Sequence, residues 1–169
     1  KGSCEYKKQS SERDKAIQRA GMSRGFSYWW GHGRFSTSGS DFNNAGSCSG
    51  SCPSCSHKGK YGGDCSGLAA KVWQVPSSNN QMDVDMHPYS TRDFVGTSKQ
   101  WFGIKRSELL AADELVYNSN GAGHIFVFES FTSTGGMWAY ECKGCSAGCV
   151  HNVRKTVSAT YKSIRKTGW

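Results

Sequence analysis

The sequence predicts an α+β fold in which helices pack on a central antiparallel β-sheet. Helix-competent segments, at residues 10–20 and 68–74, lie in the first half of the chain. Runs of β-branched and aromatic residues fill the second half, with turn-forming residues between them at 118–123 and 132–136. A length of 169 residues suits one domain, so we expect residues 1–169 to form a single unit with one insertion.

The first helix is expected at residues 10–20, where the residues match the preferences of helix ends. Ser11 can cap the helix, Glu12 and Asp14 suit its first turn, and Gly21 can end it.

A stretch rich in Gly, Ser, Asn and Cys covers residues 31–63, after an aromatic segment at 26–30. A structureless loop of this length is unusual in a compact domain and often carries a function. We therefore interpret residues 36–62 as an insertion that its cysteines cross-link. The second helix is expected at 68–74, and residues 76–80 break it.

The second half is expected to consist mainly of strands, because β-branched and aromatic residues recur there in short runs. One helical turn at residues 107–110 precedes them. The expected strands cover residues 114–117, 124–129, 137–141 and 159–166. If the second and third of these pair as a hairpin, the start of one lies beside the end of the other.

The charge of the chain favours an anionic partner. The formal net charge is +8 at pH 7, and both nucleic acid and an acidic cell envelope fit such a charge. No apolar run reaches the roughly 20 residues that a membrane-spanning helix needs. Residues 1–4 also lack the apolar stretch of a signal peptide. We therefore expect a soluble chain without a transmembrane segment.

Eight cysteines together with 21 glycines are typical of an exported protein. Six of these cysteines form two clusters of opposite spacing, each followed by a histidine two residues later. The clusters are Cys48, Cys52 and Cys55, followed by His57, and Cys142, Cys145 and Cys149, followed by His151. Disulfides and zinc are both open interpretations, and the Gly/Ser-rich surroundings favour disulfides. Without Cys65, seven cysteines remain, counting Cys4, so internal pairing would leave one thiol over.

Cys65 stands in a setting unlike that of the other cysteines. Gly62-Gly63-Asp64 precedes it and a helix-competent run from Leu68 follows, which places Cys65 at or just inside a helix N-terminus. Unpaired backbone N–H groups and the positive end of the helix dipole stabilise a thiolate at such a position. We therefore expect a reactive thiol and take Cys65 as the candidate nucleophile.

A histidine and a carboxylate complete the set that a thiol nucleophile requires. His124 starts a predicted strand after a glycine-rich turn, where its imidazole can face a cleft and act as a base. Glu141 ends the next predicted strand and would lie near His124 in the expected hairpin, so it is the candidate orienting residue. Tyr140 and Glu129 are alternatives for the orienting role.

Four ordered blocks of the chain resemble the NlpC/P60 family of cysteine peptidases. The family's Pro-Tyr-x-Trp-Gly-Gly segment matches residues 27–32, and its Asp-Cys-Ser-Gly segment matches residues 64–69. Its Gly-Asp segment and the Gly-His segment that follows match residues 113–117 and 123–128. The basic strand near residues 161–166 is similar to the family's closing segment.

This resemblance implies a papain-like core in which Cys65 is the nucleophile, His124 the base and Glu141 the orienting group. The Cys65 backbone N–H would stabilise the oxyanion, and the Tyr28 hydroxyl would assist it or hold the substrate. The candidate substrate-binding residues, which flank these positions, are Trp30, His32, Asp64 and Ser66.

Members of the family typically cut peptide bonds in bacterial peptidoglycan, often between D-glutamate and diaminopimelate or lysine. The resemblance implies a monomeric endopeptidase, secreted or associated with the periplasm or cell wall. It would act on peptide stems of an anionic envelope and bind no cofactor, metal or nucleic acid. The chain departs from the family pattern where His32 replaces the second glycine, where the loop at 35–61 is longer, and where Glu141 replaces a frequent histidine.

Two other functions fit the same residues. A papain-like amidase or acyltransferase would keep Cys65 and His124 but leave peptidoglycan uncut. A zinc-stabilised Cys/His module that binds nucleic acid would contain stoichiometric zinc and keep its activity after Cys65→Ala. Basic and aromatic residues are not interleaved as on a base-stacking platform, which disfavours this module.

Overall fold

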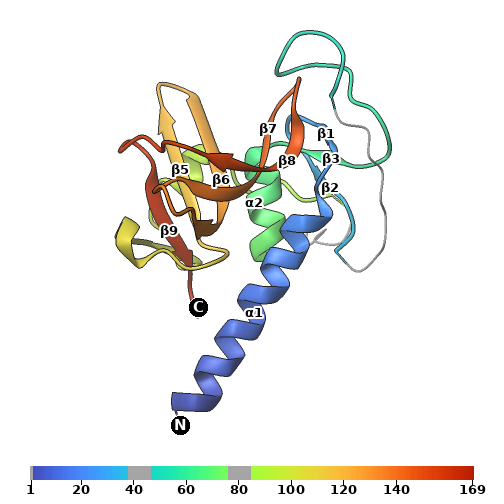
Figure 1. The fold of residues 1–169 in the computed structure, drawn as a ribbon. Coiled ribbons are helices and arrows are strands. Elements are labelled where there is room, and N and C mark those ends of the chain that lie inside the picture. Colours follow the sequence, from blue (N-terminus) through green and yellow to red (C-terminus); the bar gives the residue numbers. More distant parts are fainter. Residues whose placement is uncertain (1, 38–46, 76–84) are drawn as a thin grey trace.

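A six-stranded antiparallel sheet forms the second half of the computed structural model (Figure 1). The structure describes residues 2–37, 47–75 and 85–169, with side chains from residue 9 onward. The strands lie in the order β4 (Trp101–Ile104), β9 (Lys162–Lys166), β5 (Glu114–Ser119), β6 (Ala122–Phe131), β7 (Met137–Gly144) and β8 (Gly148–Arg154). The prediction of an α+β fold with a large antiparallel sheet is confirmed.

Helices cover one face of this sheet. α2 (Cys65–Trp73) packs against β6, and α1 (Gly2–Met22) packs against α2, with the N-terminal turns of α1 extending away from the sheet (Figure 1). The core between α2 and the sheet includes Leu68, Val72, Trp73, Val116, Ile125, Val127 and Ile164. Two short elements, α3 (Thr91–Phe94) and the 3₁₀ turn η1 (Arg106–Glu108), precede β5. Within the described segments, no helix is long and apolar enough to cross a bilayer.

A capping residue and a glycine fix the start of α2. Asp64 is the N-cap, and its Oδ1 accepts a hydrogen bond of 2.8 Å from the Gly67 N–H. Gly67 is required because a Cβ at this position would collide with the His32 carbonyl oxygen. The Asp-Cys-Ser-Gly motif therefore builds a capped helix whose first turn lies directly against another backbone segment.

That neighbouring backbone belongs to a small second sheet. It consists of β1 (Ser27–Tyr28), β3 (Gly62–Gly63) and β2 (Gly33–Arg34), with β3 in the centre. Tyr28 pairs with Gly63, which places the aromatic segment beside the residues that lead into α2. The expectation of a loop throughout residues 31–63 is wrong at both ends, because two-residue strands have no detectable periodicity.

Three disulfides join the six clustered cysteines, which confirms the prediction of disulfide bonds. The pairs are Cys48–Cys55, Cys52–Cys145 and Cys142–Cys149. The second pair ties the insertion to the turn between β7 and β8. These sulfur atoms are bonded to one another and are not thiolate ligands for zinc in this state. Cys65 is free, and the Cys4 side chain lies outside the described residues.

Several element boundaries differ from the prediction. α1 runs over Gly2–Met22 instead of 10–20, and the last strand begins at Lys162 instead of residue 159. The sequence predicts neither β4 nor β8, because each lies at an edge of the sheet and carries glycine or polar residues that obscure a strand pattern. The predicted helix break at 76–80 lies outside the described residues.

The turn between β5 and β6 is also shorter than the predicted 118–123. It consists of Asn120 and Gly121, both with positive φ (51° and 82°), a combination typical of tight hairpins. β6 therefore begins at Ala122, and His124 pairs with Tyr117 within the strand instead of starting it. The pairing of β6 with β7, predicted as a hairpin, is confirmed.

Candidate active site

Cys65 is the first residue of α2 and is partly buried. The backbone N–H groups of Ile125, Ser66 and Cys65 itself act on its sulfur and favour the thiolate. Burial, followed by the negative charge of Asp64, outweighs these groups and raises the pKa of Cys65 from 9.0 to about 12. The expectation of a thiolate stabilised by the helix N-terminus is therefore wrong for the resting protein. The thiol is protonated at neutral pH and requires a base.

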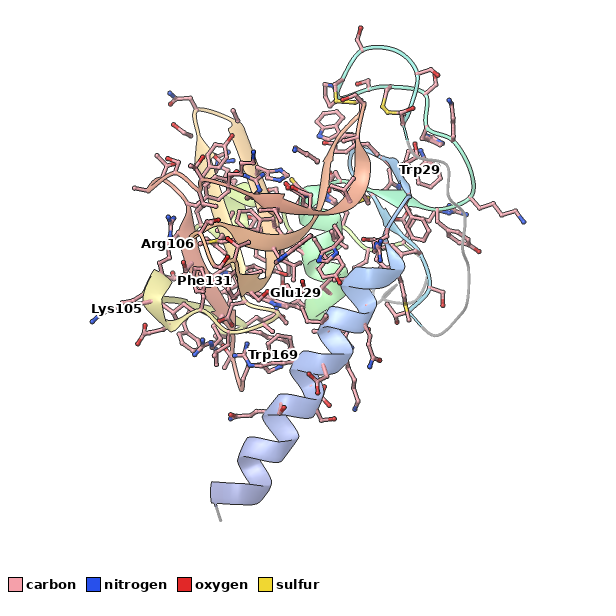
Figure 2. All side chains as sticks on the ribbon, in the orientation of Figure 1. Trp29, Lys105, Arg106, Glu129, Phe131 and Trp169 are labelled. Carbon is pink, nitrogen blue, oxygen red and sulfur yellow. A yellow bond between two sulfur atoms is a disulfide. The ribbon has the colours of Figure 1, made fainter. Side chains whose placement is uncertain are left out.

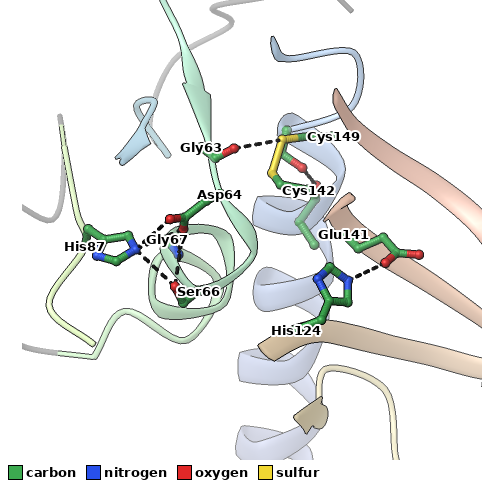
Figure 3. Close-up of a disulfide and its surroundings, with 11 residues drawn as sticks. Gly63, Asp64, Ser66, Gly67, His87, His124, Glu141, Cys142 and Cys149 are labelled. Atoms are coloured by element: carbon green, nitrogen blue, oxygen red, sulfur yellow. Dashed lines mark hydrogen bonds and ion pairs between the residues drawn. A yellow bond between two sulfur atoms is a disulfide. The ribbon is translucent and has the colours of Figure 1, made fainter. Parts of the chain in front are cut away.

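His124 and Glu141 form a short hydrogen-bonded pair across β6 and β7. The distance from His124 Nε2 to Glu141 Oε2 is 2.6 Å (Figure 3). An ionised carboxylate can only accept hydrogen bonds, so Nε2 carries the proton and Nδ1 is the nitrogen left to accept one. This pair forms because the β6–β7 hairpin brings the two residues together from adjacent strands.

Glu141 is held as an anion by three partners. Besides His124, its carboxylate accepts bonds from Asn152 Nδ2 at 2.9 Å and from Arg154 Nη2 at 2.7 Å, both on β8. Glu141 has no exposed surface, and burial alone would raise its pKa. The hydrogen bonds from His124 and Arg154 outweigh burial and lower the pKa of Glu141 to about 2. Sequence reasoning misses Asn152 and Arg154 because it does not predict β8.

The alternatives Glu129 and Tyr140 form a separate cluster. Glu129 accepts a bond of 2.8 Å from His151 Nε2 and a bond of 3.2 Å from the Tyr140 hydroxyl. The His151 ring also stacks on Tyr140, with 4.2 Å between the ring centroids. Within the described residues, no side-chain hydrogen bond joins either residue to His124, so Glu141 is the carboxylate positioned to orient that imidazole.

Cys65 lies beside this pair without a direct hydrogen bond to it. The Cys65 sulfur contacts the backbone of Ile125, the residue that follows His124. In Figure 3 the His124 ring lies between Glu141 and the N-terminal end of α2. Within the described residues, the side-chain hydrogen bond of His124 goes to Glu141 and none joins it to Cys65. Catalytic hydrogen bonds are often long or absent without substrate and tighten when substrate binds.

An open cleft of about 1040 Å³ surrounds Cys65. Four of the predicted site residues line it together with Cys65, namely Tyr28, Trp30, Asp64 and Ser66. The rest of the described lining is mostly polar and comes from residues 87–92 and from the β5–β6 turn. Trp30 is 61% exposed and supplies an aromatic surface at this cleft. His32 is not part of the lining, because its Nδ1 bonds to Asp85 at 2.7 Å.

Tyr28 reaches the cleft from β1. Burial, Cys65 and Asp64 all raise the pKa of its hydroxyl above the usual value. The phenol is therefore neutral at physiological pH and can donate a hydrogen bond to a negatively charged oxygen near Cys65.

His87 is a cleft residue that sequence reasoning does not include among the site residues. Its Nε2 lies 2.9 Å and 3.0 Å from the two Asp64 carboxylate oxygens and 3.0 Å from Ser66 Oγ. Asp64 also accepts a bond of 2.7 Å from the Gly31 N–H. No spacing in the sequence signals this contact, because His87 and Asp64 lie in separate segments that tertiary packing brings together.

Known proteins give no further guide. No family model, curated protein or solved structure matches the chain. The basis for assigning a function is therefore Cys65 with the cleft that it lines, together with the adjacent His124–Glu141 pair, whose two residues are not among the lining residues.

Proposed function

We propose that this protein is a papain-like cysteine endopeptidase that hydrolyses peptide bonds in the stem peptides of bacterial peptidoglycan. The observation that carries the proposal is the position of Cys65. It lies in an open cleft at the start of α2, against the backbone next to the His124–Glu141 pair. The motifs at residues 27–32, 64–69 and 123–128 support the same family of activities.

Acylation begins with proton transfer, because a thiol with a pKa of about 12 does not ionise on its own at neutral pH. His124 Nδ1 takes the Cys65 proton while the sulfur bonds to the scissile carbonyl carbon and the carbonyl electron pair moves to oxygen. The Cys65 backbone N–H and the neutral Tyr28 hydroxyl donate hydrogen bonds to this oxyanion. His124 then returns the proton to the leaving amine as the C–N bond breaks, which leaves a thioester.

Deacylation uses the same groups in reverse. His124 takes a proton from water, and the hydroxide oxygen bonds to the thioester carbon. The C–S bond breaks, and the thiol recovers its proton while the carboxylic acid product leaves. Glu141 remains ionised throughout, because three hydrogen-bond donors hold it. It fixes the Nε2–H tautomer of His124 and stabilises the imidazolium form.

The charge and cysteine content fit an enzyme that works on the cell envelope. A net charge of +8 favours association with the anionic wall. Three disulfides are typical of proteins that act in oxidising compartments, so we place this enzyme outside the cell or in the periplasm, as a monomer.

Digestion of purified muropeptides with wild type and with Cys65→Ala tests the proposal. Products separated by mass should show a new amine terminus with wild type and none with Cys65→Ala. His124→Ala should lower kcat/KM by at least about 10²-fold, the usual contribution of a general base. An intact muropeptide pool after prolonged digestion with wild type would refute the peptidase and leave the amidase or acyltransferase alternative.

His151→Ala is the matched control for His124→Ala. His151 also bonds to a glutamate of the same sheet, but its partner is Glu129, and it does not adjoin the Ile125 backbone that faces Cys65. The proposal expects His151→Ala to keep wild-type cleavage. Equal losses in the two variants would mean that His124 acts through the stability of the sheet and not through Cys65.

A further inference from the structure

Four cysteine sulfurs meet where the insertion reaches the turn between β7 and β8. They belong to two disulfides, Cys48–Cys55 and Cys52–Cys145. The sulfur atoms of Cys48, Cys55 and Cys145 lie within 4.8 Å of one another, and Cys52 is bonded to the last of these. In Figure 2, yellow sulfur atoms lie at the tip of the β7–β8 hairpin, beside the insertion. Two adjacent disulfides therefore place four sulfur donors in one small region.

The backbone holds these residues together independently of the sulfur–sulfur bonds. The Cys48 N–H donates a hydrogen bond of 2.9 Å to the Cys145 carbonyl oxygen. Ser49 and Ser56, which adjoin Cys48 and Cys55, pair as an isolated antiparallel β-bridge. Reduction of both disulfides would therefore leave backbone contacts that keep the thiols near one another.

Four thiols in this arrangement match the requirements of a structural zinc site. Zinc prefers a tetrahedron of thiolate or imidazole ligands with Zn–S distances of about 2.3 Å, so its ligand sulfurs lie about 3.8 Å apart. The sulfur separations of at most 4.8 Å approach this spacing. On reduction Cys52 leaves Cys145, and its side chain can then turn to the fourth corner. The spacings Cys48-x3-Cys52 and Cys52-x2-Cys55 are also typical of paired zinc ligands.

The charges of the two segments favour thiolates once the disulfides are reduced. Residues 47–63 and 143–148 contain Lys58, Lys60 and Lys143 and no carboxylate. Positive charge nearby lowers the pKa of a thiol. A zinc ion with four thiolates carries a net negative charge, which the same lysines offset. Because each thiol loses its proton to the solvent when it binds the metal, zinc binding should strengthen as the pH rises.

The third disulfide lies apart from these four sulfurs. Cys142–Cys149 joins paired positions of β7 and β8, and the Cys149 sulfur lies 3.9 Å from the Gly63 carbonyl oxygen. Within the described residues, neither of its sulfurs belongs to the group that Cys48, Cys55 and Cys145 form. This pair is therefore an internal control for any metal site.

We propose that the reduced protein binds one zinc ion at this point, and that zinc and the two disulfides are alternative cross-links of the insertion. The ligands are Cys48, Cys52, Cys55 and Cys145. Two molecules of a dithiol reductant convert the two disulfides to four thiols and are themselves oxidised to disulfides. The four thiols then release four protons and bind one Zn²⁺. Two molecules of a small disulfide, such as oxidised glutathione, reverse this step: each is reduced to two thiols, the two protein disulfides form again, and Zn²⁺ is released.

Such a site would hold the insertion in place before the disulfides form. Disulfides are rare in the reducing cytosol, so without a metal the insertion would have no cross-link to the β7–β8 turn there. The Cys55 sulfur lies 4.0 Å from the carbonyl oxygen of Tyr28, a residue that lines the cleft. The zinc form would therefore also support the strand that carries Tyr28. The inference does not depend on the proposed peptidase activity.

The zinc content of the oxidised and the reduced protein tests this site. The full chain is reduced with tris(2-carboxyethyl)phosphine, which offers no thiol to the metal, and is then incubated with zinc chloride and freed of unbound metal by gel filtration. We expect one zinc ion per reduced chain and none per oxidised chain, measured by elemental mass spectrometry.

Labelling of the reduced wild type with N-ethylmaleimide, with and without zinc, identifies the ligands by peptide mass mapping. Zinc should slow labelling of the four proposed ligands by at least about tenfold, because a thiolate bound to zinc is not free to react. It should leave labelling of Cys65, Cys142 and Cys149 unchanged. This experiment uses no substitution and therefore decides the ligands even where a variant folds poorly.

Cys48→Ser and Cys149→Ser form a matched pair, because each removes one sulfur of a disulfide but only Cys48 belongs to the proposed site. In the reduced proteins, competition with a chromophoric chelator should show zinc binding that is at least about 10²-fold weaker for Cys48→Ser, since changes outside the ligand set already cost up to this much. Cys149→Ser should bind zinc as tightly as wild type. The site is refuted if reduced wild type binds no zinc or if the oxidised protein binds as much. It is also refuted if zinc protects a different set of cysteines, or if the two serine variants lose zinc equally.

Discussion

Glu141→Gln is the substitution with the largest effect on stability that the site geometry predicts. The substitution keeps the shape of the side chain and removes the charge that faces His124 and Arg154. Partners that lower the pKa of this buried carboxyl from 4.5 to about 2 favour its ionised form by about 3 kcal/mol. Arg154 would also lose its counter-ion, so we expect a loss of about 3 kcal/mol in the free energy of unfolding at pH 7.

The pKa of Glu141 determines how the stability difference between wild type and Glu141→Gln changes with pH. The folded-state pKa of Glu141 lies below the unfolded value of 4.5. The stabilisation is therefore complete above about pH 5 and disappears as the pH falls through about 2. Urea unfolding followed by tryptophan fluorescence at pH 7, 5 and 3 should show a difference between wild type and Glu141→Gln that shrinks steadily towards acid.

Glu129→Gln is the control for this measurement. Glu129 also bonds to a histidine, but its side chain is 28% exposed, and no arginine of the described segments pairs with it. The Glu129→Gln variant should lose at most about 1 kcal/mol in the free energy of unfolding. A loss below about 0.5 kcal/mol for Glu141→Gln at pH 7 would refute the reasoning. A loss of stability for Glu141→Gln that is equally large at pH 7 and at pH 3 would also refute it.

Two further predictions concern buried acidic groups. Among the described residues, neither oxygen of the buried Glu114 carboxyl has a hydrogen-bond partner, and burial together with Asp113 raises its pKa well above 4.5. The free energy of unfolding of wild type should therefore fall as the pH rises from 4.5 through this pKa. Glu114→Leu should be about 1 to 2 kcal/mol more stable than wild type at pH 7, and its stability should not fall over this pH range. Alkylation of native Cys65 by iodoacetamide should be slow at pH 7 and accelerate about tenfold per pH unit up to pH 10, because only the thiolate reacts. A rate that levels off below pH 7 would contradict this prediction.

The His124–Glu141 pair could be predicted from sequence because its determinants are local. Runs of β-branched and aromatic residues and the turn at residues 132–136 define the β6–β7 hairpin, and a hairpin fixes which residues face one another. Asn152 and Arg154, which complete the surroundings of Glu141, could not be predicted in the same way. They lie on β8, an edge strand whose polar and apolar residues do not alternate strictly, so its sequence gives no clear strand signal.

The same distinction applies to Asp64 and His87. The capping role of Asp64 follows from its position three residues before Gly67, within a single helical turn. Its contact with His87 joins segments separated by more than 20 residues and depends on how the small sheet and the 85–90 segment pack around α2. Disulfide formation could likewise be expected from composition, but the bond between Cys52 and Cys145 could not be assigned from spacing.

The raised pKa of Cys65 also explains how a nucleophile can remain free beside three disulfides. The Cys142–Cys149 disulfide lies next to the site, with the Cys149 sulfur 3.9 Å from the Gly63 carbonyl oxygen, two residues before Cys65 (Figure 3). Exchange with a disulfide requires a thiolate, and burial together with Asp64 keeps the resting thiol protonated. In the proposed mechanism, activation then depends on a substrate that fills the cleft and on His124 as the base. The burial and the Asp64 charge that keep the Cys65 thiol protonated thus also protect it from exchange with the neighbouring disulfide.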